Sequence, residues 1–172
     1  CGDDSVMAIY NSGGEINDGN DVVEFVLHTN NGTSLGTLLA TNSSPIFFFA
    51  PPMVYGVTYY ISAIMGNDDG TGSVDLSDPC LSVAQGTPVT FYEEPTADLG
   101  ADSDVCEGES ATLSVVLTGT APWDLVYSDG AQNINVNGIL GSPYNFDVTP
   151  TATTTYTLVS VQDPNCVGTV IG

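Results

Sequence analysis

Apolar and polar side chains alternate along most of the second half of the chain. One run covers residues 111–117, and further runs of the same kind cover 123–127 and 144–148. Successive side chains of a strand point to opposite faces, so a period of two predicts strands with one buried face. Clusters of Gly, Pro, Asp and Asn separate the runs. The pattern predicts an all-β chain of two-sheet sandwiches, with no helix longer than about two turns.

The first half reads as a diverged copy of the second. Residues 1–5 and 106–110 both place a Cys and a Ser around acidic residues, and residues 58–64 match 155–161. Such an internal repeat predicts two tandem β-sandwich domains, residues 1–94 and 95–172. The first domain is the longer one, with an insertion near residues 66–77. Its predicted strands are 5–10, 22–29, 36–40, 46–50, 58–64 and 89–92.

The second copy also carries a resemblance to a known family. From Cys106 to Cys166 it reads T-G-T-A-P-W, S-D-G, S-P-Y, T-P-T-A-T-T-T-Y-T-L and D-P-N-C in turn. This run resembles the immunoglobulin-like/PKD-like repeats of long secreted adhesins and surface proteins of Bacteroidota. The resemblance covers nearly all of residues 95–172. It implies structural and adhesive modules, often in tandem, at an extracellular or cell-surface location.

The charge of the chain excludes several classes of partner. Asp and Glu number 21, Lys and Arg are absent, and the net charge is −21. A chain without basic residues cannot neutralise phosphates, which argues against nucleic acid and anionic membranes. The longest apolar run, 46–52, is far too short for membrane insertion. The expected partners are copies of this chain or neighbouring repeats, and no adhesive ligand can be named.

The ends of both predicted domains look incomplete. A sandwich of this type needs a strand before Cys1, and only residues 167–171 follow Cys166. An open sheet edge readily accepts a strand from another chain, which predicts end-to-end assembly. The alternative is that the sequence is a piece of a longer protein.

Four cysteines without a C-x-x-C element indicate disulfides in an oxidising setting rather than a zinc site. In an immunoglobulin-type sandwich Cys1 and Cys106 precede the second strand, whereas Cys80 and Cys166 follow the sixth. These positions lie at opposite ends, over ~20 Å apart for a strand of ~7 residues, and a disulfide needs Cα atoms within about 7 Å. Topology therefore favours the cross-domain pair Cys1–Cys166, with Cys80 and Cys106 left for neighbouring repeats. Bulges or long loops leave the internal pairs Cys1–Cys80 and Cys106–Cys166 open.

Candidate chemistry is sparse. His28, the only His, falls on a strand with no nucleophile motif nearby and is expected to face solvent. The sequence thus predicts no catalytic residue and no enzyme. Asp4-Ser5-Val6 resembles the O-glycosylation motif of the same bacterial group, which makes Ser5 a candidate glycosylation site.

One loop offers oxygen ligands for a cation. Asn67, Asp69, Thr71 and Asp75 surround flexible glycines, and calcium prefers several oxygens in one short loop. The competing interpretation is a solvated turn. No other cofactor is expected.

The sequence leaves two candidate functions. The leading prediction is a non-enzymatic structural or adhesive repeat of an extracellular surface protein or filament that assembles end to end. The alternative is an accessory glycan- or calcium-binding module of a secreted enzyme.

Overall fold

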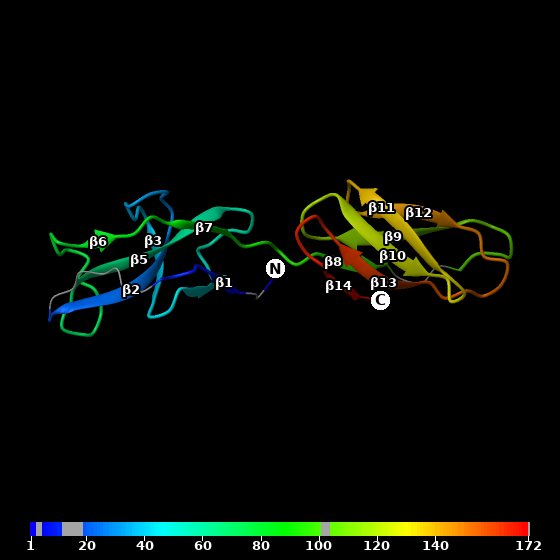
Figure 1. Cartoon of the computed structure of the whole chain (residues 1–172). Helices are drawn as coiled ribbons and strands as arrows, with labels where there is room; N and C mark the ends of the chain where they lie inside the picture. Colours follow the sequence, from blue (N-terminus) through cyan, green and yellow to red (C-terminus); the bar gives the residue numbers. More distant parts are fainter. Residues whose placement is uncertain (3–4, 12–18, 101–103, 172) are drawn as a thin grey trace. The chain divides into compact units, whose positions relative to one another are not determined.

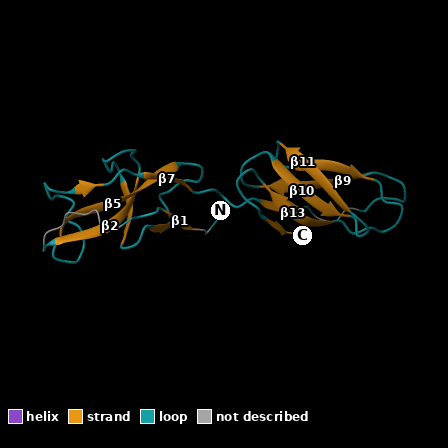
Figure 2. Cartoon of the chain, viewed as in Figure 1, coloured by secondary structure: helices purple, strands orange, loops and turns teal. Residues whose placement is uncertain are grey.

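The computed structural model describes residues 1–2, 5–11, 19–100 and 104–171. Every regular element in these ranges is a strand, as the orange arrows of Figure 2 show, so the all-β prediction is confirmed. The chain divides into two compact units. The N-terminal unit is Gly2–Phe91, and the C-terminal unit is Tyr92–Gly172 together with Cys1. The division thus falls between Phe91 and Tyr92, slightly before the predicted boundary.

The C-terminal unit is a sandwich of two sheets (Figure 1). Its described strands are β8 (Thr96–Leu99), β9 (Ala111–Leu117), β10 (Trp123–Ser128), β11 (Asn133–Ile139), β12 (Tyr144–Val148), β13 (Thr157–Gln162) and β14 (Thr169–Ile171). One sheet has the order β12-β9-β8-β14 and the other β11-β10-β13. Neighbouring strands are antiparallel, except that β14 lies parallel to β8. The last strand, although only three residues long, is therefore paired.

The inward face of each strand of this unit meets one core. Ala97, Val115 and Leu125 are fully buried, and Trp123 packs against the same cluster. The indole Nε1 of Trp123 donates a hydrogen bond of 2.7 Å to the carbonyl oxygen of Thr118. A buried N–H group that has a hydrogen-bond partner costs little stability, so the Trp123 side chain stabilises the unit mainly through its large apolar surface.

The N-terminal unit also has two sheets (Figure 1). Its described strands are β1 (Ser5–Met7), β2 (Asp21–His28), β3 (Leu38–Asn42), β4 (Ile46–Phe48), β5 (Thr58–Asn67), β6 (Ser82–Val83) and β7 (Thr87–Thr90). The small sheet pairs β1 with β4. The large sheet runs β3-β2-β5, and both β6 and β7 pair with β5. The β2–β5 ladder extends without interruption from Asp21↔Asn67 to His28↔Tyr60.

Strand β2 is buried on both faces. Phe25 and Leu27 point into the core shared with the small sheet. On the opposite face Val26 packs with Ile64 and Val74 in a separate apolar cluster. Val74 lies in the segment between β5 and β6, so this segment covers a face that an isolated sandwich would leave in water.

The predicted strands of the N-terminal unit all appear, with shifted ends. The predicted strands do not include β6, which has two residues, or β8, β11 and the short β14. In β11 the apolar residues Ile134, Val136 and Ile139 are separated by Asn and Gly. That partial alternation was a readable signal for a strand with one half-buried face.

We expect Leu125→Ala to destabilise the C-terminal unit by about 2–5 kcal/mol, because a fully buried Leu leaves a cavity when it is truncated. Trp123 is the only Trp of the chain, so its fluorescence during denaturant unfolding reports on this unit. Leu140→Ala is the matched control, since Leu140 is 79% exposed and its truncation should change stability by less than about 0.5 kcal/mol. Equal effects of the two substitutions would contradict the assigned core.

Candidate functional site

A disulfide joins Cys1 to Cys166, with their Cα atoms 5.8 Å apart. This is the pair that strand topology favours. Cys1 is peptide-bonded to Gly2, the first residue of the N-terminal unit, and Phe91 is peptide-bonded to Tyr92. Both ends of the N-terminal unit are therefore covalently attached to the C-terminal unit.

The turn that carries Cys166 is held by one carboxylate. Asp163 Oδ1 accepts hydrogen bonds from the backbone N–H groups of Asn165 (2.8 Å) and Cys166 (2.7 Å). Its Oδ2 accepts a third from the backbone N–H of Thr120, at 3.0 Å. The Asp163 N–H in turn donates to the carbonyl oxygen of Cys166, at 2.9 Å. These hydrogen bonds hold the backbone of Cys166 in place in addition to the bond that its sulfur forms.

Cys80 lies in a turn of the same construction. Asp78 Oδ1 accepts the N–H of Cys80, and its Oδ2 accepts the N–H of Asn67, both at 2.8 Å. Donation from Asn67 and then from Cys80 lowers the pKa of the Asp78 carboxyl below its ordinary value. Asp78 is only 8% exposed, so the charged carboxylate is a structural part of the turn. In each unit an aspartate carboxylate therefore accepts the backbone N–H of the cysteine and fixes its turn.

The internal pair Cys106–Cys166 conflicts with the strand register. β14 starts beside the start of β8, where Thr169 pairs with Thr96. Thr96 in turn forms hydrogen bonds with Thr118, which directly follows the end of β9. The turn that carries Cys166, just before β14, therefore lies near the end of β9. Cys106 instead precedes the start of β9. The seven residues of β9 separate these ends by about 20 Å, and disulfide geometry requires Cα atoms within about 7 Å. Cys80 and Cys106 are exposed free thiols.

His28 corrects the sequence-based expectation. The prediction placed it in solvent, but its side chain is fully buried. Nδ1 lies 2.9 Å from the carbonyl oxygen of Leu35 and Nε2 lies 2.9 Å from the hydroxyl of Ser62. The imidazole ring lies on the same face of β2 as Val26, and loop segments cover that face. Burial lowers the pKa of His28, while the bond to Leu35 acts in the opposite direction.

The two polar contacts of His28 assign the tautomer of its neutral ring. A carbonyl oxygen can only accept, so Nδ1 carries the proton and donates to Leu35. Nε2 is then the acceptor for the Ser62 hydroxyl. The described residues contain no buried side-chain N or O atom without a partner. His28 is thus a satisfied core residue. Its hydroxyl partner Ser62 is itself only 1% exposed, so this pair is closed to any substrate.

The predicted calcium ligands lie in one loop but turn towards their own backbone. Asp69 Oδ1 accepts the N–H and hydroxyl of Thr71, at 2.8 and 2.6 Å, and this lowers the pKa of Asp69. Asp75 Oδ1 accepts the corresponding groups of Ser77, and the amide oxygen of Asn67 accepts from Asn20.

Asp69 and Asp75 do share a cavity of about 310 Å³ with Glu24. However, no group of three or more His, Cys, Asp or Glu side chains in the described ranges is placed to hold a metal ion. Calcium binding therefore stays a prediction.

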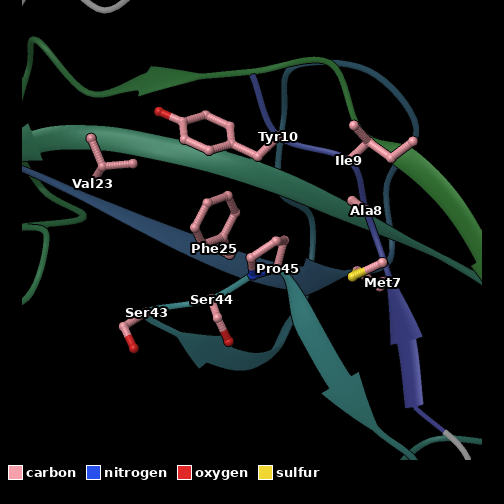
Figure 3. A pocket seen from close by; sticks show the side chains of 9 residues that line it. All are labelled: Met7, Ala8, Ile9, Tyr10, Val23, Phe25, Ser43, Ser44 and Pro45. Atoms are coloured by element: carbon pink, nitrogen blue, oxygen red, sulfur yellow. The ribbon is translucent and has the colours of Figure 1, made fainter. Parts of the chain in front are cut away.

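A second cavity, of about 620 Å³, opens in the N-terminal unit (Figure 3). Tyr10 meets Phe25 edge-on there, with ring centroids 5.0 Å apart. The lining residues carry no acidic, basic or thiol side chain; they are Met7, Ala8, Ile9, Tyr10, Val23, Phe25, Ser43, Ser44 and Pro45. Such a lining provides no pair of groups for general acid–base chemistry.

Ser5, the predicted glycosylation site, is exposed in β1, while Asp4 of its motif lies outside the described residues. Glycosylation stays a prediction. The described residues contain no helix that is long and apolar enough to cross a membrane.

Comparison with known proteins supports the predicted fold but contradicts the predicted location of the protein. Residues 94–172 match the family described as "Nucleoporin POM152, Ig-like domain". The chain is also 25% identical over 154 residues to "Nucleoporin pom152" of Schizosaccharomyces pombe. That alignment covers 86% of this chain and 12% of the relative, so the chain spans about an eighth of the relative's length. No solved structure matches. The two units are immunoglobulin-like β-sandwiches.

These matches correct two expectations. The predicted extracellular or cell-surface location is wrong, because the matched family and the named relative are both nucleoporins. The resemblance to Bacteroidota adhesins is supported only in its immunoglobulin-like part. Repeat signatures such as turn motifs and core aromatics follow the fold, and related folds occur in proteins of different settings.

The buried His28 predicts a pH dependence of stability. Burial lowers its pKa from the ordinary value of 6.5, so the unfolded chain binds the proton more tightly. The stabilisation from neutral His28 is present above about pH 6.5 and is lost as the pH falls below it. Calorimetric melting of the N-terminal unit at pH 7.5 and 5.5 measures this loss, each kcal/mol lowering the midpoint by about 4–8 °C.

His28→Asn is the control for that measurement. Asn keeps a hydrogen-bond donor but does not titrate, and both proteins share the same acidic residues. We expect the wild type to lose more stability than His28→Asn between the two pH values. Parallel pH profiles would show that His28 does not titrate differently in the folded and unfolded chains.

Proposed function

We propose that the chain is a non-catalytic structural segment, in which two consecutive immunoglobulin-like domains act as one stiff piece of a longer scaffold. The observation that carries this proposal is the Cys1–Cys166 bond. A peptide linker alone leaves two domains free to reorient, and relative motion is the default for a small interface. A second covalent attachment removes much of that freedom.

The composition supports a mechanical role. A net charge of −21 repels neighbouring domains from one another, which favours an extended chain but does not fix its geometry. A disulfide is insensitive to salt and to this repulsion. The bond therefore supplies the fixed connection that electrostatics cannot provide in a chain without basic residues.

The relatives suggest the setting of such a scaffold. They are nucleoporins, and the chain corresponds to 12% of the named one. We infer that the segment has further immunoglobulin-like domains as its neighbours and serves a nucleoporin-like scaffold. Its partners are then neighbouring repeats or copies of itself, joined end to end.

Measurement of domain motion tests the proposal. We expect both units of the wild-type chain to show one common rotational correlation time by ¹⁵N relaxation, since a chain of 17.8 kDa suits this method. In the double variant Cys1→Ser/Cys166→Ser the two units should tumble with shorter and unequal times. Amide shifts of each core serve as the test of correct folding.

The matched control is Cys80→Ser/Cys106→Ser. It removes two cysteines as well, but these are free thiols, so the common correlation time should remain. Independent tumbling in the wild type, or unchanged tumbling after loss of the disulfide, would contradict the stiff-segment proposal.

A further inference from the structure

The two free thiols occupy the same places in the repeat as the two bonded ones. Cys106 precedes β9 of the C-terminal unit as Cys1 precedes β1 of the N-terminal unit, and each is followed by an acidic stretch and a Ser. Cys80 directly follows the pair Asp78-Pro79, and Cys166 follows Asp163-Pro164 after one further residue. The carboxylate of each Asp accepts the backbone N–H of its cysteine. All four cysteines therefore belong to two structural classes, a leading cysteine and a turn cysteine.

The observed bond shows how these two classes combine. It joins the leading cysteine of the N-terminal unit, Cys1, to the turn cysteine of the unit that follows, Cys166. It does not join the two classes within one unit, where the strand length holds them apart. In this bond the leading cysteine of one unit thus pairs with the turn cysteine of the following unit.

We propose that Cys106 is the bonding site for the turn cysteine of a following repeat, and that Cys80 is the bonding site for the leading cysteine of a preceding repeat. This inference rests on the proposed function as a tandem scaffold. The result is a ladder of disulfides in which each domain is stapled to both of its neighbours.

The surroundings of both thiols suit this role. Both are exposed, so each can reach a sulfur on another domain. A hollow of about 290 Å³ opens beside Cys106, formed with the loop of Pro150 and Thr151. The hollow provides room for a short turn of the Asp-Pro-Cys type next to the Cys106 sulfur.

The chemistry of the bond is an ordinary thiol–disulfide exchange. A thiolate attacks a small disulfide such as oxidised glutathione and releases one glutathione thiolate. The second cysteine then displaces the remaining glutathione. One S–S bond of the oxidant is broken and one S–S bond between the domains is formed, and two glutathione thiols are produced.

A two-copy chain tests the proposal. Two copies of residues 1–172 are connected by an additional copy of residues 93–105, the stretch that precedes Cys106 in the native chain. Under a glutathione redox buffer we expect a bond between Cys106 of the first copy and Cys80 of the second. Since each copy has two free cysteines, free thiols should fall from four to two per molecule.

The bond is identified by peptide mapping without reduction. The chain has no Lys or Arg, so a Glu-specific protease replaces trypsin. Cys106→Ser in the first copy is the control and should leave three free thiols, with the Cys1–Cys166 bond of both copies unchanged.

Two outcomes would overturn the ladder: four free thiols in the oxidised two-copy molecule, or a Cys80–Cys106 bond within a monomer of one 172-residue copy. A single-copy chain mapped in parallel separates this result from the proposed function. If the single copy lacks Cys1–Cys166, the stiff-segment proposal fails; if that bond forms and the ladder bond does not, only the present inference fails.

Discussion

The fixed length of a β-strand is the constraint on which the connections of this chain depend. β9 holds Cys106 at one end of the C-terminal unit, while the β13–β14 turn presents Cys166 at the other. Their separation of about 20 Å exceeds the reach of a disulfide several-fold. Cys166 therefore cannot bond to Cys106 within its own domain. It bonds instead to Cys1, the residue that precedes the N-terminal unit.

Most of the architecture could be predicted because the strands have one buried face. The run at β12 alternates cleanly, the runs at β9 and β10 alternate except at Val116 and Val126, and the positions of Gly and Pro mark their ends. The two-residue β6 lies below what periodicity can resolve. The strand pairing also favoured the Cys1–Cys166 bond, since it depends on topology and not on side-chain detail.

The burial of His28 could not be predicted for a physical reason. Alternation shows which side chains share a face, but not whether a loop covers that face. The segment between β5 and β6 brings Val74 onto the outer face of β2, and this buries Val26 and His28 together. The location of the protein could not be predicted from the sequence either. Cysteines indicate only that disulfides can form, and the nucleoporin relatives contradict the extracellular location that was inferred from them.

The central claim is that the cysteine before the N-terminal unit bonds to the turn of the C-terminal unit. Peptide mapping of the unreduced 172-residue chain tests it directly. The account predicts one linked peptide pair containing Cys1 and Cys166, with Cys80 and Cys106 recovered as free thiols. Recovery of Cys1 linked to Cys80 would contradict it, because each domain would then close its own bridge and nothing beyond the peptide linker would connect the two.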